Sequence, residues 1–484
     1  MPDSACVLHN SGLKVCISEF QTLAMTNPAK CFLCSAECED TCQTCTLSFC
    51  SSSHLRVHKQ TGKCSPWMVE TRPGVGRVVV AVRDIQPFEL VMRDTDLLGM
   101  VMVDAKACVM CGEMKDLRKC VCGFVRCNTG CFESKHIDEC SELKRINTKS
   151  KTLKDKTRLV TCLGFWRMIK LKQQDPEKWE NLMKLVSHVE KRKKSKQFRK
   201  SVKHLVKNLN LLNADGTNEV LLSRLQGILE TNSHSFNKSI HHIFNIFSII
   251  SHSCIPNCEH LLTGKQAIVR AKMLVRKGEE ITIRYSELCL HREILQEEIA
   301  ASWLFRCCCP RCSDSSELGT EASSFKCEWC KGGFVREYEE NMITCNNCEK
   351  VMTHKEYIDK AESLRKLEIN CKARDDIPAL IEKMEKLGGH PMYHSVIQLK
   401  IRFLESSIGS MDTKFLPLFL EYSQDVNRFM DALNPGISRL RGRLMSCSRK
   451  AAASRNEDTV NGNREDSGKN RLIEQKMMSG YFKC

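Results

Sequence analysis

Cysteine is the residue type with the clearest chemistry in this chain, because 31 of its 484 residues are cysteines and most of them fall in four short clusters. Closely spaced thiols and imidazoles are the ligands that zinc prefers, four to each tetrahedral ion. A chain of this size needs no disulfides in order to fold. We therefore expect metal ligands, enough for about six zinc ions.

The first cluster, at 31–64, holds four pairs of soft ligands, which is enough for two zinc ions. Interleaving these pairs assigns the first and third pairs to one ion and the second and fourth pairs to the other. The two predicted ligand sets are Cys31, Cys34, Cys50 and His54, and Cys42, Cys45, His58 and Cys64.

The second cluster, at 108–140, repeats this arrangement. Its order of ligands resembles the MYND zinc finger, a module that binds other proteins. We therefore predict a MYND finger at 108–140 and a MYND-like finger at 31–64. The interleaved sets of the second cluster are Cys108, Cys111, Cys127 and Cys131, and Cys120, Cys122, His136 and Cys140.

Two further clusters follow. The last places two Cys-x2-Cys pairs fourteen residues apart, a spacing typical of a zinc ribbon. The one before it offers only three ligands, so its fourth ligand must come from elsewhere. The ligands are Cys307, Cys309 and Cys312 in the third cluster, and Cys327, Cys330, Cys345 and Cys348 in the fourth.

The segments between the clusters must position these sites. A glycine turn and a β-branched run between Arg72 and Met100 predict two short strands. Helical periodicity predicts helices over 141–226, and again over 353–447 with breaks at Gly388-Gly389 and Pro435-Gly436.

Three motifs resemble a known family. Ser251-His252-Ser253-Cys254-x-Pro256-Asn257 is similar to the Asn-His-Ser-Cys-x-Pro-Asn motif of SET-domain lysine methyltransferases. The segment from Gly278 to Tyr285 (GEEITIRY) resembles their second hallmark, and Cys-x-Cys-x2-Cys from Cys307 resembles their post-SET zinc site. A SET domain split by a MYND finger is the organisation of the SMYD family. The extra finger and the ribbon resemble its arthropod SmydA subgroup.

The resemblance implies an α+β fold in which the finger interrupts the SET β-fold and a helical domain follows. The predicted divisions are 1–30 (extension), 31–64 (MYND-like finger), 72–107 (SET, first part), 108–140 (MYND finger), 141–226 (helical insert), 227–288 (SET core), 289–320 (post-SET), 327–348 (zinc ribbon), 353–447 (helical domain) and 448–484 (polar tail, expected to be disordered).

The resemblance also implies roles for individual residues. Cys254 completes the post-SET zinc site, and Tyr285 is the catalytic tyrosine, in a channel that must desolvate a lysine of ordinary pKa about 10.4. The expected cofactor is S-adenosylmethionine. The residues that would bind it are Gly74, Gly76, Asn232, Ser251, His252, Tyr285 and Phe305.

One departure keeps a second hypothesis open. Ser251 stands where the motif has asparagine, and a lost hydrogen bond to a charged group would cost about 1.5 to 3 kcal/mol. The leading hypothesis is a methyltransferase of histone or non-histone lysines that acts in transcriptional regulation. The alternative is a weak or inactive SET and MYND scaffold that recruits peptide partners.

A third hypothesis, a nucleic-acid-binding zinc protein, depends on the net charge of +16 and on nine Lys and Arg residues within 191–207. Such a run is either a solvated helix face or a contact for an acidic partner or nucleic acid. No apolar run of about eighteen residues and no secretion signal is found, so we expect an intracellular protein of nucleus and cytoplasm, with no membrane partner.

Overall fold

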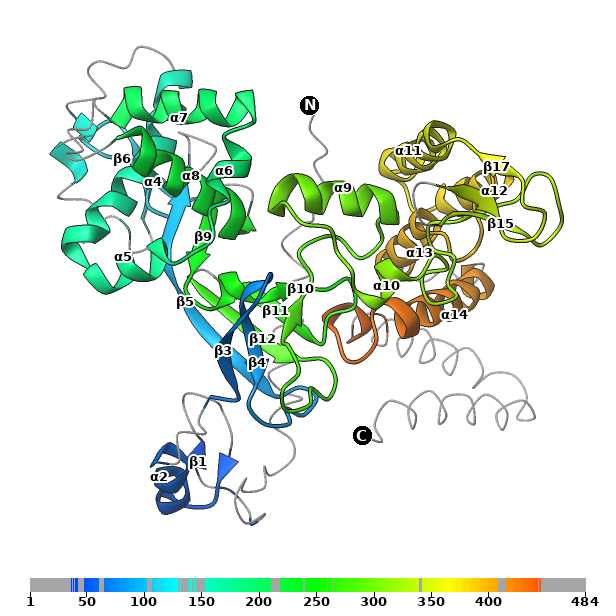
Figure 1. Ribbon diagram of the computed structural model, residues 1–484, viewed down its shortest axis with the longest axis horizontal. Helices are drawn as coiled ribbons and strands as arrows, with labels where there is room; N and C mark the ends of the chain where they lie inside the picture. The colour runs from blue at the N-terminus through cyan, green and yellow to red at the C-terminus, as the bar shows by residue number, and fades with distance from the viewer. Residues whose placement is uncertain are drawn as a thin grey trace, which may run out of the picture. The chain divides into compact units, whose positions relative to one another are not determined.

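The computed structural model describes two compact units of the chain (Figure 1). Among the described residues, the first unit comprises 36–287 and 292–312, and the second comprises 288–291 and 313–444. The described residues are 36, 38, 40, 41, 48–60, 65–101, 107–111, 113–128, 131, 139–141, 143, 144, 153–209, 218–237, 240–263, 265–338, 342–407, 415–442 and 444.

The first unit is built around a five-stranded antiparallel sheet in the order β11-β12-β5-β9-β8. Its central strand, β5, pairs through Leu90–Thr95 with β12 and through Asp96–Val101 with β9. Burial alternates along β12, as in a strand with one face on a core. The strands are β5 (Leu90–Val101), β8 (Ser233–Asn237), β9 (Ile240–Phe244), β11 (Cys258–Thr263) and β12 (Gln266–Ala271).

Two smaller strand pairs flank this sheet. The hairpin of β3 (Trp67–Arg72) and β4 (Gly76–Ala81) turns through Gly74 and Gly76, whose φ angles of 74° and 97° favour glycine. Strand β10 (Ser251–His252) runs parallel to β13 (Thr282–Ile283). The two short strands predicted between Arg72 and Met100 correspond to β4 and β5. Strand β5 is longer than predicted, because its first half pairs with β12 and its second half with β9.

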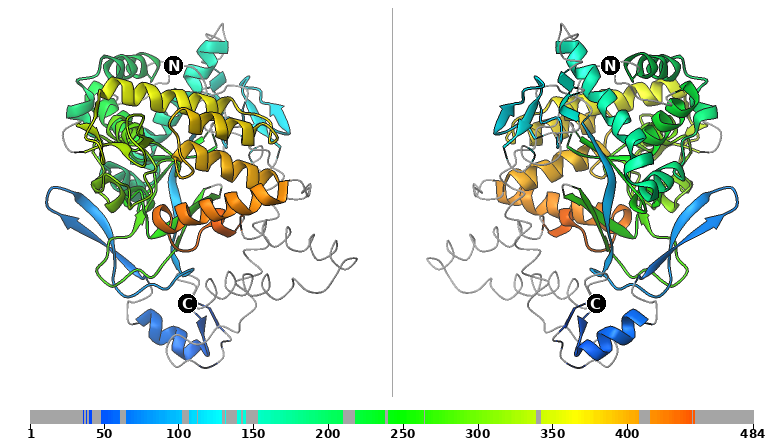
Figure 2. Two further views of the ribbon diagram at one scale, coloured as in Figure 1. Left: turned by 90° about the vertical axis from the view of Figure 1, so that its right-hand side faces the viewer. Right: turned by 90° about the vertical axis from the view of Figure 1, so that its left-hand side faces the viewer.

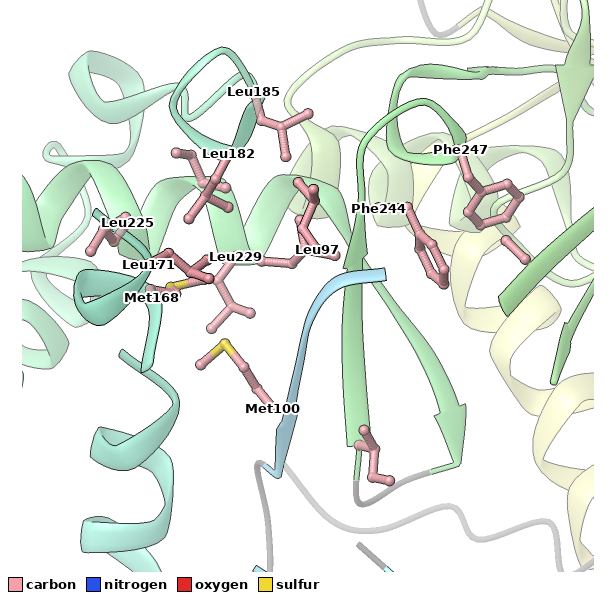
Figure 3. Close-up of a cluster of buried hydrophobic side chains, with 14 of the residues drawn as sticks. Leu97, Met100, Met168, Leu171, Leu182, Leu185, Leu225, Leu229, Phe244 and Phe247 are labelled. Carbon is pink, nitrogen blue, oxygen red and sulfur yellow. The ribbon is translucent and has the colours of Figure 1, made fainter. Parts of the chain in front are cut away.

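A layer of helices covers part of the sheet. Leu97 and Met100 of β5 pack among leucines and methionines of α4, α5 and α8 (Figure 3). Helix α8 continues to Asn232, beyond the expected end of the insert at 226. The helices are α4 (Leu153–Gln174), α5 (Pro176–Met183), α6 (Val189–Arg192), α7 (Lys196–Leu209), α8 (Glu219–Asn232), the 3-10 helix η2 (Phe247–Ile249) and α9 (Arg292–Trp303).

Short elements mark the two fingers. The described parts are β1 (Asp40–Thr41), β2 (Ser48–Phe49) and α2 (Ser52–Gln60) in the first, and the antiparallel pair β6 (Leu117–Lys119) and β7 (Val125–Cys127) in the second. The predicted extension at 1–30 and the tail at 448–484 lie outside the described residues. The same holds for Cys31, Cys34, Cys42, Cys45, Cys64, His136 and the side chain of His58.

The second unit joins a four-stranded antiparallel sheet, β14-β15-β16-β17, to a helical bundle. The predicted breaks are confirmed: α12 ends just before Gly388, and α14 just before Pro435. Figure 2 shows α13 and α14 side by side. The elements are β14 (Phe325–Lys326), β15 (Phe334–Glu337), β16 (Ile343–Cys345), β17 (Val351–Met352), α11 (His354–Asn370), α12 (Ile377–Lys386), α13 (His394–Ser406) and α14 (Leu416–Leu433).

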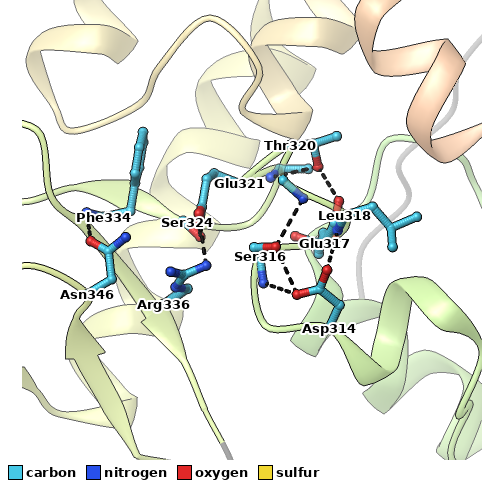
Figure 4. A network of polar contacts seen from close by, with 12 residues as sticks. Asp314, Ser316, Glu317, Leu318, Thr320, Glu321, Ser324, Phe334, Arg336 and Asn346 are labelled. Carbon is cyan, nitrogen blue, oxygen red and sulfur yellow. Dashed lines mark hydrogen bonds and ion pairs between the residues drawn. The ribbon is translucent and has the colours of Figure 1, made fainter.

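A polar network orders the chain before this sheet (Figure 4). The Asp314 carboxylate accepts hydrogen bonds from the N–H groups of Ser316, at 2.8 Å, and Leu318, at 2.9 Å. Glu321 then forms an ion pair with Arg336 of β15 at 2.9 Å. The turn is thus tied to the sheet through side chains.

Candidate active site and metal centres

The post-SET cysteines converge with Cys254, which lies 53 positions before the first of them. Helix α10 (Pro310–Ser313) carries Cys312. The four sulfurs lie within 4.8 Å of one another, and Cys254 Sγ is 3.8 Å from Cys307 Sγ and 3.5 Å from Cys312 Sγ. Tetrahedral zinc with bonds of about 2.3 Å places its sulfurs ~3.8 Å apart. The set of Cys254, Cys307, Cys309 and Cys312 therefore fits a zinc ion.

Side chains outside this cluster hold its loops. Gln296 of α9 donates through Nε2 to the carbonyl of Cys307 at 2.7 Å and accepts the N–H of Cys307 at 2.9 Å. Arg284 donates through Nε to the carbonyl of Cys254 at 3.2 Å. Such contacts orient metal ligands.

The second finger forms two clusters with the predicted membership. The sulfurs of Cys120, Cys122 and Cys140 gather in one, for which the predicted fourth ligand, His136, lies outside the described residues. The buried Arg126 donates to Cys120 Sγ at 3.5 Å, which favours a thiolate there. The other cluster consists of Cys108, Cys111, Cys127 and Cys131.

The ribbon cysteines also gather in one group. Gly333 lies so close that an added Cβ would be 2.5 Å from Cys345 Sγ and 2.8 Å from Cys330 Sγ. The N–H groups of Trp329 and Asn347 point at sulfurs, at 3.3 and 3.4 Å. These donors fit thiolates that bind zinc. The group is Cys327, Cys330, Cys345 and Cys348.

In the first finger, the structure describes one predicted contact. Cys50 Sγ lies 3.3 Å from His54 Nδ1, as expected of two ligands of one ion.

Tyr285 lies directly after the parallel pair of β10 and β13. This pairing sets Ser251 beside Thr282 and His252 beside Ile283. The main-chain N–H of Tyr285 donates to His252 Nδ1 at 3.0 Å, and its hydroxyl donates to the carbonyl of Ile250. Burial, with a contribution from Glu280, raises the pKa of Tyr285 well above its usual value, so the hydroxyl keeps its proton.

His252 connects this tyrosine to the zinc ligands. Since Nδ1 accepts a hydrogen bond, the proton of a neutral ring is on Nε2, which lies 3.3 Å from Cys254 Sγ. The predicted cofactor residue is therefore also a support of the metal cluster.

Aromatic rings surround Tyr285. Its ring centroid lies 5.0 Å from that of Trp303, 5.2 Å from that of His252 and 6.4 Å from that of His234. Phe305 lies 6.3 Å from His252. Desolvation by burial lowers the pKa of His234 to about 3, so this ring is neutral at physiological pH. The rings around Tyr285 can desolvate an amine.

Trp303 and His234 were not predicted from the sequence. Trp303 stands two residues before the predicted cofactor residue Phe305, and this proximity in the sequence could have indicated it. Asn257 was also overlooked as a positioning residue, although it belongs to the quoted motif. Its Oδ1 accepts the N–H of Thr282 at 2.9 Å, and its Nδ2 donates to the carbonyl of Glu280 at 2.8 Å. Asn257 thus holds the strand that leads to Tyr285.

The other proposed cofactor residues have distinct positions. Gly74 and Gly76 lie in the open β3-β4 turn, and main-chain hydrogen bonds join β4 to Glu279 and Ile281. The Asn232 amide donates to the carbonyls of Val186 and Ile228, at 2.7 and 2.8 Å. Ser251, His252, Tyr285 and Phe305 are brought together, whereas no hydrogen bond in the described part of the chain joins Asn232 or the two glycines to them.

The comparisons with known proteins agree with this geometry. The SET domain family model matches residues 76–286, a range that encloses the cysteine clusters at 108–140. SET domain-containing protein SmydA-8, isoform A, of Drosophila melanogaster is 24% identical over 309 residues, which cover 60% of this chain and 66% of that protein. The chain contains a SET domain and is similar to SET and MYND domain-containing proteins.

Another similar protein is histone-lysine N-methyltransferase ASHR1 of Arabidopsis thaliana. It is 25% identical over 402 residues, which cover 76% of this chain and 80% of that protein. A solved structure, Rubisco LSMT bound to AdoMet, is 14% identical with a TM-score of 0.30, over 87% of this chain and 98% of that one. No described helix of this chain combines the length and apolarity needed to cross a bilayer.

Proposed function

We propose that this protein is a SMYD-type protein-lysine N-methyltransferase that uses S-adenosylmethionine and acts on histone or non-histone lysines in transcriptional regulation. The observation that carries the proposal is the position of Tyr285, whose main chain is held by His252 and whose hydroxyl is held by the Ile250 carbonyl. The name of the relative ASHR1, a histone-lysine N-methyltransferase, supports the same reaction class.

Ser251 and His252 are the residues best placed to bind the amino-acid end of the cofactor. The Ser251 hydroxyl makes no hydrogen bond within the described part of the chain, so it is available as donor or acceptor. Phe305, 38% exposed and beside His252, offers an aromatic face to an adenine ring. When bound, S-adenosylmethionine supplies the methyl group of its sulfonium.

The residues around Tyr285 prepare the amine. The rings of Trp303 and His234 exclude water, which disfavours the ammonium form of a lysine. The Tyr285 hydroxyl and the Ile250 carbonyl are fixed dipoles that can orient the lone pair and stabilise positive charge on the transferred methyl carbon. These residues hold the reacting amine without forming a covalent bond to it.

The experiment is a calorimetric titration of the zinc-loaded protein with S-adenosylmethionine, followed by methyl transfer to a peptide array. We expect binding and transfer. Absence of both, unrescued by Ser251→Asn, would reject the enzyme and leave the scaffold, in which the fingers at 31–64 and 108–140 recruit proline-rich peptides. The cysteines in the described part of the chain form no disulfides and most of them gather as metal ligands, which fits a reducing compartment and supports placing the protein in nucleus and cytoplasm.

A further inference from the structure

Helix α7 has two opposite faces of different chemistry. Its apolar side chains are buried, whereas four lysines on the other face are exposed. The lysines follow one another at intervals of four, three and four residues, which places them in one stripe along a helix of 3.6 residues per turn. The buried residues are Phe198, Val202, Leu205 and Leu209, and the stripe consists of Lys196, Lys200, Lys203 and Lys207.

Within the described part of the chain, no carboxylate neutralises this lysine stripe. The sequence has no Asp or Glu between positions 191 and 214. Within the described residues, none of the four lysines forms an ion pair, and the neighbouring Glu190 is 3.6 Å from Lys193 instead. Lys191 and Lys194 are exposed as well and extend the positive charge toward the N-terminus of the helix.

The stripe is presented on a fixed support. Arg192, the one buried cation of the run, forms an ion pair with Glu230 of α8 at 2.7 Å and donates to the carbonyl of Ser302 in α9 at 2.8 Å. Arg199 donates to the carbonyl of Lys194 at 3.0 Å, which holds the turn between α6 and α7. Helix α7 packs on α4 and α8 and forms the outer edge of the helical layer (Figure 1).

We propose that the lysine stripe of α7 binds the phosphate backbone of double-stranded DNA without reading its sequence. The stripe is ~16 Å long at 1.5 Å per residue, which matches about five phosphates of one strand spaced at 3.4 Å along the duplex. Lysine offers a point charge and no planar fork for reading base edges.

The aromatic content of the run argues for a duplex over a single strand. Proteins that bind single strands stack bases on exposed aromatic rings. Between 191 and 209 the chain has one Phe, Tyr or Trp residue, Phe198, and it is only 4% exposed. The proposal is independent of methyl transfer, since it involves α7 and none of the residues around Tyr285.

The test measures binding of the full, zinc-loaded chain to a fluorescent duplex of random sequence at several salt concentrations. The variant replaces Lys196, Lys200, Lys203 and Lys207 by glutamine. If all four contact phosphates, the slope of log affinity against log salt falls by about 3.6 in magnitude in the variant. With this difference in slope, the affinity of the unmodified chain falls roughly a hundredfold more than that of the variant between 50 and 200 mM salt.

A matched control replaces four exposed lysines of the second unit, Lys355, Lys366, Lys372 and Lys383, by glutamine. The control has the same net charge as the variant and should bind the duplex like the unmodified chain. Equal slopes for the stripe variant and the control would overturn the proposal. Tighter binding of a polyglutamate peptide or a single strand than of the duplex, lost in the stripe variant, would reject double-stranded DNA as the ligand. Unchanged circular dichroism of the variant shows that any loss is not caused by unfolding.

Discussion

The main-chain N–H of Tyr285 donates a hydrogen bond to Nδ1 of His252 over 3.0 Å. The other nitrogen of the same ring lies 3.3 Å from Sγ of Cys254, a member of the post-SET cluster. A change in the metal cluster therefore reaches the proposed catalytic tyrosine through a single side chain.

Replacing His252 by alanine should remove both contacts of the ring, the one to the main chain of Tyr285 and the one to the zinc ligand Cys254. Residues that support metal ligands typically contribute 10- to 100-fold to metal affinity or activity, so we expect a loss of about that size in zinc retention or in methyl transfer. Zinc content by mass spectrometry and transfer of labelled methyl measure it. An unchanged value of both would show that the Nε2 contact has no effect.

Tyr285→Phe should separate binding from chemistry. The substitution removes only the hydroxyl, which contacts the Ile250 carbonyl. Ser251 and Phe305 stay in place, so the affinity for S-adenosylmethionine should change little. Methyl transfer should fall by roughly a hundredfold, as for other groups that stabilise charge in a transition state. Single-turnover kinetics beside calorimetry checks this expectation. A parallel loss of affinity would mean that Tyr285 is a structural residue.

Ser251→Asn should increase cofactor affinity. The asparagine side chain has two more heavy atoms than that of serine, its polar atoms lie one bond further out, and its amide both donates and accepts. A new hydrogen bond to a charged group is worth about 1.5 to 3 kcal/mol, or roughly ten- to more than hundredfold in the dissociation constant. Calorimetry of the two proteins measures the ratio. Ser251→Ala is the control, and a higher affinity for it than for the asparagine variant would contradict the argument.

Asp425→Asn should destabilise the helical bundle of the second unit. Asp425 accepts from Lys400 Nζ at 2.5 Å, and Lys400 is 1% exposed, so the variant leaves a buried cation without its carboxylate. Breaking such a pair costs about 3 to 5 kcal/mol in free energy of unfolding. Urea denaturation measures it. The control is Asp375→Asn, because Asp375 is paired with Arg374 at an exposed position. This change should lower the free energy of unfolding by less than about 1 kcal/mol.

Gly333→Ala should release the ribbon zinc, because the added Cβ would overlap Cys345 Sγ and Cys330 Sγ. Gly332 is the matched control: its φ of 80° makes alanine strained, but nothing lies within 4 Å of an added Cβ. We expect one zinc fewer per chain for the first variant and full zinc for the second, by metal analysis. Equal zinc in both would exclude a steric role for Gly333.

Much of the metal architecture could be predicted from the sequence, because spacing between ligands is a local property. The Cys50 and His54 contact and the cysteine sets of the second finger and the ribbon follow from such spacing. The addition of Cys254 to the third cluster needed the family resemblance, since no local pattern connects residues 53 positions apart.

The surroundings of Tyr285 were less accessible to sequence reasoning. Trp303 and His234 belong to a helix end and a strand, α9 and β8, and periodicity does not show which distant element a side chain faces. Asn232 closes α8 with its amide on main-chain carbonyls, because a buried amide must find partners wherever the helix ends.

Strand β5 has a consequence for how this chain reaches its folded state. Val101 pairs with Ile240 and Thr95 with Gln266, so partners about 140 and 170 positions later complete the sheet. During synthesis β5 leaves the ribosome long before either neighbour exists, and its edges stay open meanwhile. Closing such long loops makes folding slow, which exposes the nascent chain to aggregation. Assembly of the sheet is thus a late event that must wait for the finger and the helices encoded between its halves.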